Sequence, residues 1–147
     1  MPAPDPRIEL VGRWLGKAAA DAGAATALLH ERGRTEPWTA CFHAQQAVEK
    51  CVKAVLVASG IEPPYVHNLV ALKALAPPGW SPGVSDEDLG LLTTYAAAPR
   101  YAFAELEAEE DPSWTDAEGA VALALVVEDS TRAWLRANGF DVPMRRP

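Results

Sequence analysis

The sequence contains few of the residues that usually carry catalysis or cross-linking. Of its 147 residues, two are cysteines and three are histidines. It has no glycine-rich phosphate loop, no dinucleotide-binding glycine fingerprint and no Gly-x-Ser-x-Gly nucleophile motif. The histidines, His30, His43 and His67, do not have the spacing of metal ligands. The sequence therefore predicts neither a metal site nor a bound cofactor.

Long apolar runs are also missing. No uninterrupted apolar stretch approaches the roughly 18 residues of a membrane span. The first residues, MPAPDPRIEL, have neither the basic nor the apolar region of a signal peptide. Cys41 and Cys51 would lie about 15 Å apart along one predicted helix, which is too far for a disulfide. We therefore expect a cytoplasmic protein with reduced thiols and no membrane partner.

Positive charge is scarce in the second half of the chain. The net charge is −7, made up of +1 over residues 1–75 and −8 over residues 76–147. Between residues 101 and 131 there is no Lys or Arg, and carboxylates are concentrated in the run ELEAEED. Proteins that wrap DNA need many Lys and Arg side chains to replace phosphate counterions. The balance excludes such wrapping, although a local basic groove is compatible with it.

Helical periodicity dominates what is present. Apolar residues recur at spacings of three and four, and no strand-like alternation occurs. We predict an all-α fold, a four-helix up-and-down bundle with one or two short extra helices. The predicted domain covers residues 8–140, between flexible ends at 1–7 and 141–147. The predicted helices cover residues 8–30, 38–59, 69–76, 86–98 and 114–137.

Residues 38–59 form the helix around which the others are predicted to pack. More than half of its circumference is apolar or small, whereas a surface helix needs a stripe of only about 100°. The remaining arc, which we call the polar edge, carries His43, Gln46, Glu49, Lys50 and Lys53. Its donors suit a nucleotide phosphate, so this is a candidate ligand-binding surface. The alternatives are a solvated face or a dimer seam.

The segment CFHAQQAVEKCVKAVLVASGIEPPYVHNLVAL, which begins at Cys41, resembles the signature of the HEPN domain family. Two further blocks, Trp14 to Asp21 and Tyr95 to Tyr101, are similar to other parts of that family. The resemblance implies a four-helix bundle, often a homodimer, frequently encoded beside a small nucleotidyltransferase partner. It also implies a range of activities, from RNA-cleaving toxins to inert binding subunits.

The nuclease members that the resemblance implies carry an Arg followed, after four to six residues, by a His. Arg100 is in the matching region, but Glu105, Leu106 and Glu107 occupy the positions where the His would stand. An ionised glutamate would repel the RNA phosphate, and Glu105 could act as a base only if burial raised its pKa. We therefore expect no nuclease site of the usual kind.

Arg100 and Tyr101 remain candidates for binding. The guanidinium could hold a phosphate while the ring stacks on a base; an ion pair of Arg100 with Glu105 is the alternative. Our hypothesis is a protein that binds a nucleotide, an RNA end or a nucleotidyltransferase through His43, Gln46, Lys50, Lys53 and these two residues. The competing hypotheses are an RNase toxin of a toxin-antitoxin pair with an unconventional site, and a purely structural dimerisation module.

Overall fold

The computed structural model describes residues 3–96 and 111–146, which form helices and no strands. The elements are α1 (Pro6–Leu28), α2 (Pro37–Ala58), α3 (Leu69–Ala74), α4 (Asp86–Thr93), a 3-10 turn (Thr94–Ala96) and α5 (Trp114–Ala137). The predicted all-α fold is confirmed. Within the described ranges no helix is both long enough and apolar enough to cross a membrane.

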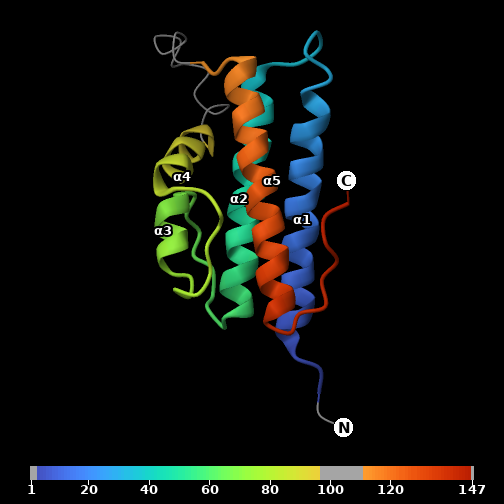
Figure 1. Cartoon of the computed structure of the whole chain (residues 1–147), viewed down its shortest axis with the longest axis vertical. Coiled ribbons are helices and arrows are strands. Elements are labelled where there is room, and N and C mark those ends of the chain that lie inside the picture. Colours follow the sequence, from blue (N-terminus) through green and yellow to red (C-terminus); the bar gives the residue numbers. More distant parts are fainter. Residues whose placement is uncertain (1–2, 97–110, 147) are drawn as a thin grey trace.

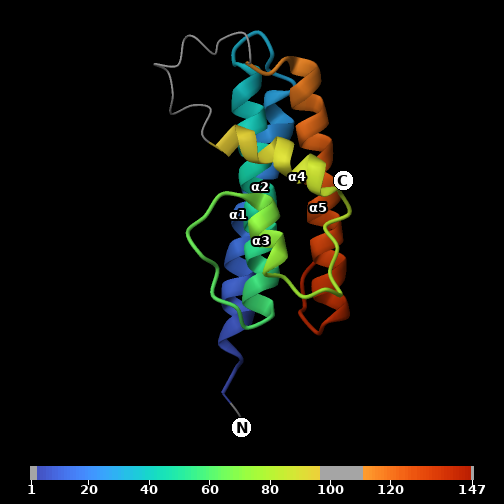
Figure 2. The ribbon, with the colours of Figure 1, turned by 90° about the vertical axis from the view of Figure 1, so that its left-hand side faces the viewer.

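The three long helices lie side by side, and α1 runs opposite to α2 and α5 (Figure 1). The short helices α3 and α4 cover α2 on the side away from α1, and α4 crosses the long helices (Figure 2). The third long helix was predicted over residues 86–98, but α4 ends at Thr93. The Thr93 hydroxyl donates to the Leu89 carbonyl, and the Thr94 hydroxyl donates to the Leu91 carbonyl. Such side-chain bonds to the preceding turn slightly destabilise a regular α-helix.

Helix α2 is central, as predicted. Of its 22 residues, 15 are buried, including Cys41 and Cys51, which are free thiols. Trp80, in the loop between α3 and α4, packs against the core of the bundle and is only 5% exposed. Most of the apolar core therefore surrounds α2, with α1 and α5 on one side and the short helices on the other.

One predicted helix start needs correction. Helix α1 begins at Pro6, two residues earlier than expected, because Asp5 caps it and proline is well suited to the first helical position. Helix α5 begins at Trp114, as predicted. Thr115 and Glu118 have the spacing of a capping box in the sequence. The box is instead formed by Ser113 and Asp116. The predicted start of α4 at residue 86 is confirmed, with Ser85 and Asp88 forming its capping box.

Glycine ends two of the long helices. After α2, Gly60 has φ of +77°, and the Ile61 amide donates to the Leu56 carbonyl at 2.8 Å. These are features of the Schellman motif, which needs a left-handed residue that glycine adopts without strain. Gly139 has φ of +90° after α5, where the sequence predicted the helix to end.

One pole of the bundle joins the ends of three helices. Arg7, at the start of α1, donates to the carbonyl of Ala58 at 2.8 Å, and its guanidinium lies 5.8 Å from the ring centroid of Phe140. Beyond Phe140 the chain turns back along α5, where Val142 is buried and Arg132 donates to the Pro143 carbonyl at 2.8 Å. The flexibility of residues 1–7 and 141–147 stays a prediction.

Burial predicts that both cysteines of the native protein are unreactive. Burial raises the pKa of the Cys41 thiol to about 11 and that of Cys51 to about 12, and only the thiolate attacks an alkylating agent. With iodoacetamide at about pH 8, where free cysteine reacts readily, neither should be modified faster than the chain unfolds. Both should react promptly in guanidinium chloride. Mass spectrometry of timed samples measures this; fast native alkylation of either residue would contradict the packing.

Candidate functional site

The polar edge of α2 is held by two carboxylates. One is Asp21, which reaches across from α1, and the other is Glu49, which belongs to the edge itself. We call Asp21, His43 and Lys50 the Asp21 cluster. The Glu49 cluster consists of Gln45, Glu49, Lys53 and His67. Both clusters lie along α2, and they differ in the solvent exposure of their side chains.

In the Asp21 cluster, one carboxylate accepts two bonds from α2. His43 Nδ1 lies 2.8 Å from Asp21 Oδ1, and Lys50 Nζ donates to Asp21 Oδ2. The side chains of His43 and Lys50 are 31% and 21% exposed, so both meet solvent while they are held in place. A carboxylate on Nδ1 fixes the ring orientation and favours the tautomer whose Nε2 can accept a hydrogen bond. With a neutral imidazole the cluster has no net charge.

The Glu49 cluster is mostly buried. Glu49 Oε1 lies 2.8 Å from His67 Nδ1 and accepts from Gln45 Nε2 at 3.2 Å, and Oε2 accepts from Lys53 Nζ at 3.1 Å. The side chains of Glu49 and Lys53 are 6% and 7% exposed, whereas His67 is 49% exposed. Lys53 Nζ also lies 5.6 Å from the ring centroid of Trp14, close enough for a cation-π contact.

These contacts decide the protonation state of Glu49. Burial alone would raise the pKa of its carboxyl, since it disfavours the charged form. The hydrogen bonds from His67, Gln45 and Lys53 and the charge of Lys53 outweigh burial, so the pKa lies below its usual value. The cluster is thus an ion pair at neutral pH that ties α2 to the loop preceding α3.

The structure changes the predicted role of the polar edge. Lys53 was predicted as a ligand donor on a free surface, but it is buried and paired with Glu49. Gln46 donates to Gln45 at 2.6 Å, which couples it to the buried cluster. His43 and Lys50 are brought together at the surface, although Asp21 already engages both. Ligand binding by these residues stays a prediction.

The remaining predicted site residues, Arg100, Tyr101 and Glu105, lie outside the described residues. Of the described residues, no group of three or more His, Cys, Asp or Glu could hold a metal ion. His67 contacts the Glu49 cluster twice: its ring lies against Glu49, and its carbonyl accepts from Gln45 at 3.3 Å.

Sequence reasoning missed the partners that hold the polar edge. Helical periodicity places Asp21 on one face of α1 with Arg13 and Lys17. In the structure Arg13 pairs with Glu9, and Asp21 reaches α2. One signal was available, because Glu49 and Lys53 have the i, i+4 spacing of a helical ion pair. Asp21 contacts residues 22 and 29 positions away in the sequence, and His67 contacts a residue 18 positions away. Helical periodicity gives no information on such long-range contacts.

Comparison with known proteins gives a family and a structural relative. The model of the HEPN domain matches residues 11–140, a range that includes both clusters. The crystal structure of TT1696 from Thermus thermophilus superposes with a TM-score of 0.67 at 25% sequence identity, covering 84% of this chain and 96% of that one. Among curated proteins, none matches.

Glu49 is expected to be important for stability at neutral pH. Glu49→Gln removes the charge that neutralises buried Lys53, and breaking a buried pair in this way costs about 3 kcal/mol. The matched control is Glu9→Gln, whose pair with Arg13 is exposed, and it should cost less than about 0.5 kcal/mol. Urea unfolding at neutral pH measures both free energies.

The pH dependence of Glu49→Gln has a definite sign. Because the folded-state pKa of Glu49 is lowered, its stabilisation is present above the ordinary glutamate pKa and is lost as the pH falls through the folded value. The free energies of unfolding of the wild type and Glu49→Gln should therefore converge in acid. A constant difference at every pH, or equal effects of Glu49→Gln and Glu9→Gln, would contradict the assignment.

Proposed function

Because this chain belongs to the HEPN domain family, we propose that it is a binding member of that family which recognises the phosphate of a nucleotide or of an RNA end. The observation that supports this most is the Asp21 cluster. It presents two nitrogen-bearing side chains, His43 and Lys50, next to each other on a partly exposed surface. Both are fixed by a carboxylate, so little side-chain entropy is lost when a ligand binds.

The chemistry of the cluster suits a phosphate. Lys50 has three N–H donors, and Asp21 occupies one of them. His43 carries a second donor when it is protonated, on the nitrogen that faces away from Asp21. Since Asp21 cancels the charge of Lys50, the attraction to an anion is moderate. We expect binding that weakens as the salt concentration rises.

In this proposal Lys53 does not touch the ligand. It stabilises the polar edge from below, together with Glu49 and Trp14. Arg100 and Tyr101 remain proposed contributors, a phosphate clamp and a stacking ring respectively. The proposal describes binding without cleavage because positions 105–107 hold Glu, Leu and Glu in place of the histidine of the family's nucleases.

A second candidate function is docking of a protein partner such as a small nucleotidyltransferase. The loop between α2 and α3 favours it, since Tyr65 is fully exposed and Val66 is 38% exposed, next to His67 of the Glu49 cluster. Exposed tyrosines are frequent anchors of protein interfaces. Tyr65→Ala would weaken a protein complex and leave the affinity for a nucleotide unchanged, so the two functions can be separated.

Lys50→Ala tests the phosphate proposal. A charged hydrogen bond contributes about 1.5 to 3 kcal/mol, so the affinity for a 5′-phosphorylated oligoribonucleotide or ATP should fall about tenfold or more. Lys73→Ala is the matched control, since it removes the same charge from an ion pair, with Asp86, remote from the cluster in sequence. Fluorescence anisotropy with labelled ligands measures both affinities.

Three outcomes would count against the proposal. The first is no saturable binding to the wild type, and the second is an equal effect of Lys50→Ala and Lys73→Ala. The third is cleavage of RNA by the wild type that Arg100→Ala abolishes, which would support the toxin hypothesis. A 5′-hydroxyl oligoribonucleotide serves as the ligand control and should bind more weakly than its phosphorylated form.

A further inference from the structure

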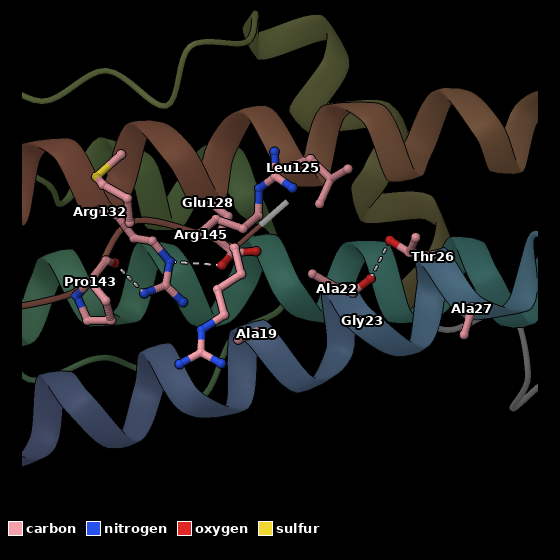
Figure 3. Close-up of a pocket in the computed structure, with 12 residues that line it drawn as sticks. Ala19, Ala22, Gly23, Thr26, Ala27, Leu125, Glu128, Arg132, Pro143 and Arg145 are labelled. Atoms are coloured by element: carbon pink, nitrogen blue, oxygen red, sulfur yellow. Dashed lines mark hydrogen bonds and ion pairs between the residues drawn. The ribbon is translucent and has the colours of Figure 1, made fainter.

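A groove of about 600 Å³ lies between α1, α5 and the C-terminal segment that turns back along α5 (Figure 3). This volume is within the range of small-molecule sites, about 300 to 1,000 Å³. No residue of the Asp21 or Glu49 cluster lines the groove, so it is separate from the proposed phosphate site. It has an apolar part and a polar part, and they come from different segments.

The apolar part is built mainly from small residues of α1. Ala19, Ala22, Gly23 and Ala27 follow one another at helical spacing, and Leu125 of α5 stands opposite (Figure 3). The one polar side chain here, Thr26, uses its hydroxyl to donate to the Ala22 carbonyl at 2.8 Å. This wall is therefore shallow and offers no free side-chain donor, which suits the face of a planar apolar group.

Gly23 marks where the groove is open. A Cβ added at this position would meet no atom within 4 Å, so the glycine is not required for close packing of the helices. Its φ is that of ordinary helix, and a larger residue would fit there without strain. The space beside Gly23 is thus available to a ligand.

The polar part carries an excess of positive charge. Glu128 and Arg132 are buried and paired at 2.9 Å, so they cancel each other. Arg145 binds Asp129 through two bonds, at 2.9 and 3.1 Å. Arg146 also lines the groove and is exposed. Counting these five groups leaves one net positive charge at this end, in a protein whose net charge is −7.

From this arrangement we propose that the groove binds a planar aromatic molecule that carries one acidic group. The ring lies on the small-residue wall of α1, and the acidic group meets the guanidinium of Arg146. Guanidinium planes also stack well on aromatic faces, which favours a ring over an alkyl chain. A ligand of this kind meets the positive charge that these five groups leave and covers the apolar wall at the same time.

Two dyes of similar ring structure and different charge test the proposal. 8-Anilinonaphthalene-1-sulfonate is an aromatic anion, and N-phenyl-1-naphthylamine is its neutral analogue. The folded wild type should bind the anion at one site per chain, as measured by fluorescence titration, and more tightly than the neutral dye. Lys50→Ala should bind the anion as the wild type does, which separates this site from the proposed phosphate site.

Gly23→Leu should fill the groove and weaken binding of the anion at least tenfold. Gly16→Leu is the control, since Gly16 lies on the same helix with equally open space around it but does not line the groove. Both changes replace a glycine inside a helix by a better helix former, so neither should lower stability. Urea unfolding of each variant confirms that the dye is not reporting a loosened fold.

Arg146→Ala should weaken the anion several-fold and leave the neutral dye unchanged. Equal binding of the anion by Gly23→Leu, Gly16→Leu and the wild type would overturn the location of the site. An equal effect of Arg146→Ala on the two dyes would overturn the role of the charge. Absence of saturable binding of the anion to the folded wild type would overturn the proposal as a whole.

Discussion

The structure depends on how a buried carboxylate is paired. Helix α2 is enclosed by its neighbours, and Glu49 sits within that enclosure. An ionised carboxylate in such a place is tolerated only when charge and hydrogen bonds compensate it. Lys53, Gln45 and His67 provide that compensation, and His67 comes from the loop that leads to α3. The contacts that stabilise the charge of Glu49 therefore also hold the loop before α3 against α2.

Helical periodicity was sufficient to predict the fold class and the central helix. Each helix has its own pattern of small and apolar residues, and this local information is what periodicity reads. At the helix ends, more than one local sequence signal was compatible with the same stretch of chain. The predicted start of α1 at residue 8 did not take into account that Pro6 suits the first helical turn. Before α5, Ser113 and Thr115 both precede an acidic residue at the capping distance. The early end of α4 involves threonine hydroxyls that bond back to the helix, which periodicity does not include.

The candidate site was predicted less completely because its partners come from different elements. The polar edge was recognised as a strip along one helix, but its lysines were treated as free. Asp21 and Glu49 occupy them, and the Asp21 contacts depend on how α1 packs against α2. The sequence resemblance pointed to residues 41–72 without separating the buried members of this segment from its exposed ones. Only the packing of the helices shows that Lys53 is buried and that Lys50 lies at the surface.

Arg7 has a consequence for how the bundle opens. Its guanidinium contacts the end of α2 and the turn after α5 while its own residue begins α1, so the three helix ends at this pole share one side chain. Fraying of any one end disturbs the other two, and fluctuations here are expected to be cooperative. At the opposite pole, Arg32 joins the α1–α2 turn to the start of α5 through its pair with Glu118 and a cation-π contact with Trp114, whose ring centroid lies 5.3 Å away. At each pole a half-exposed arginine thus links segments that are far apart in the sequence, and the amides of the linked helix ends are expected to exchange at similar rates.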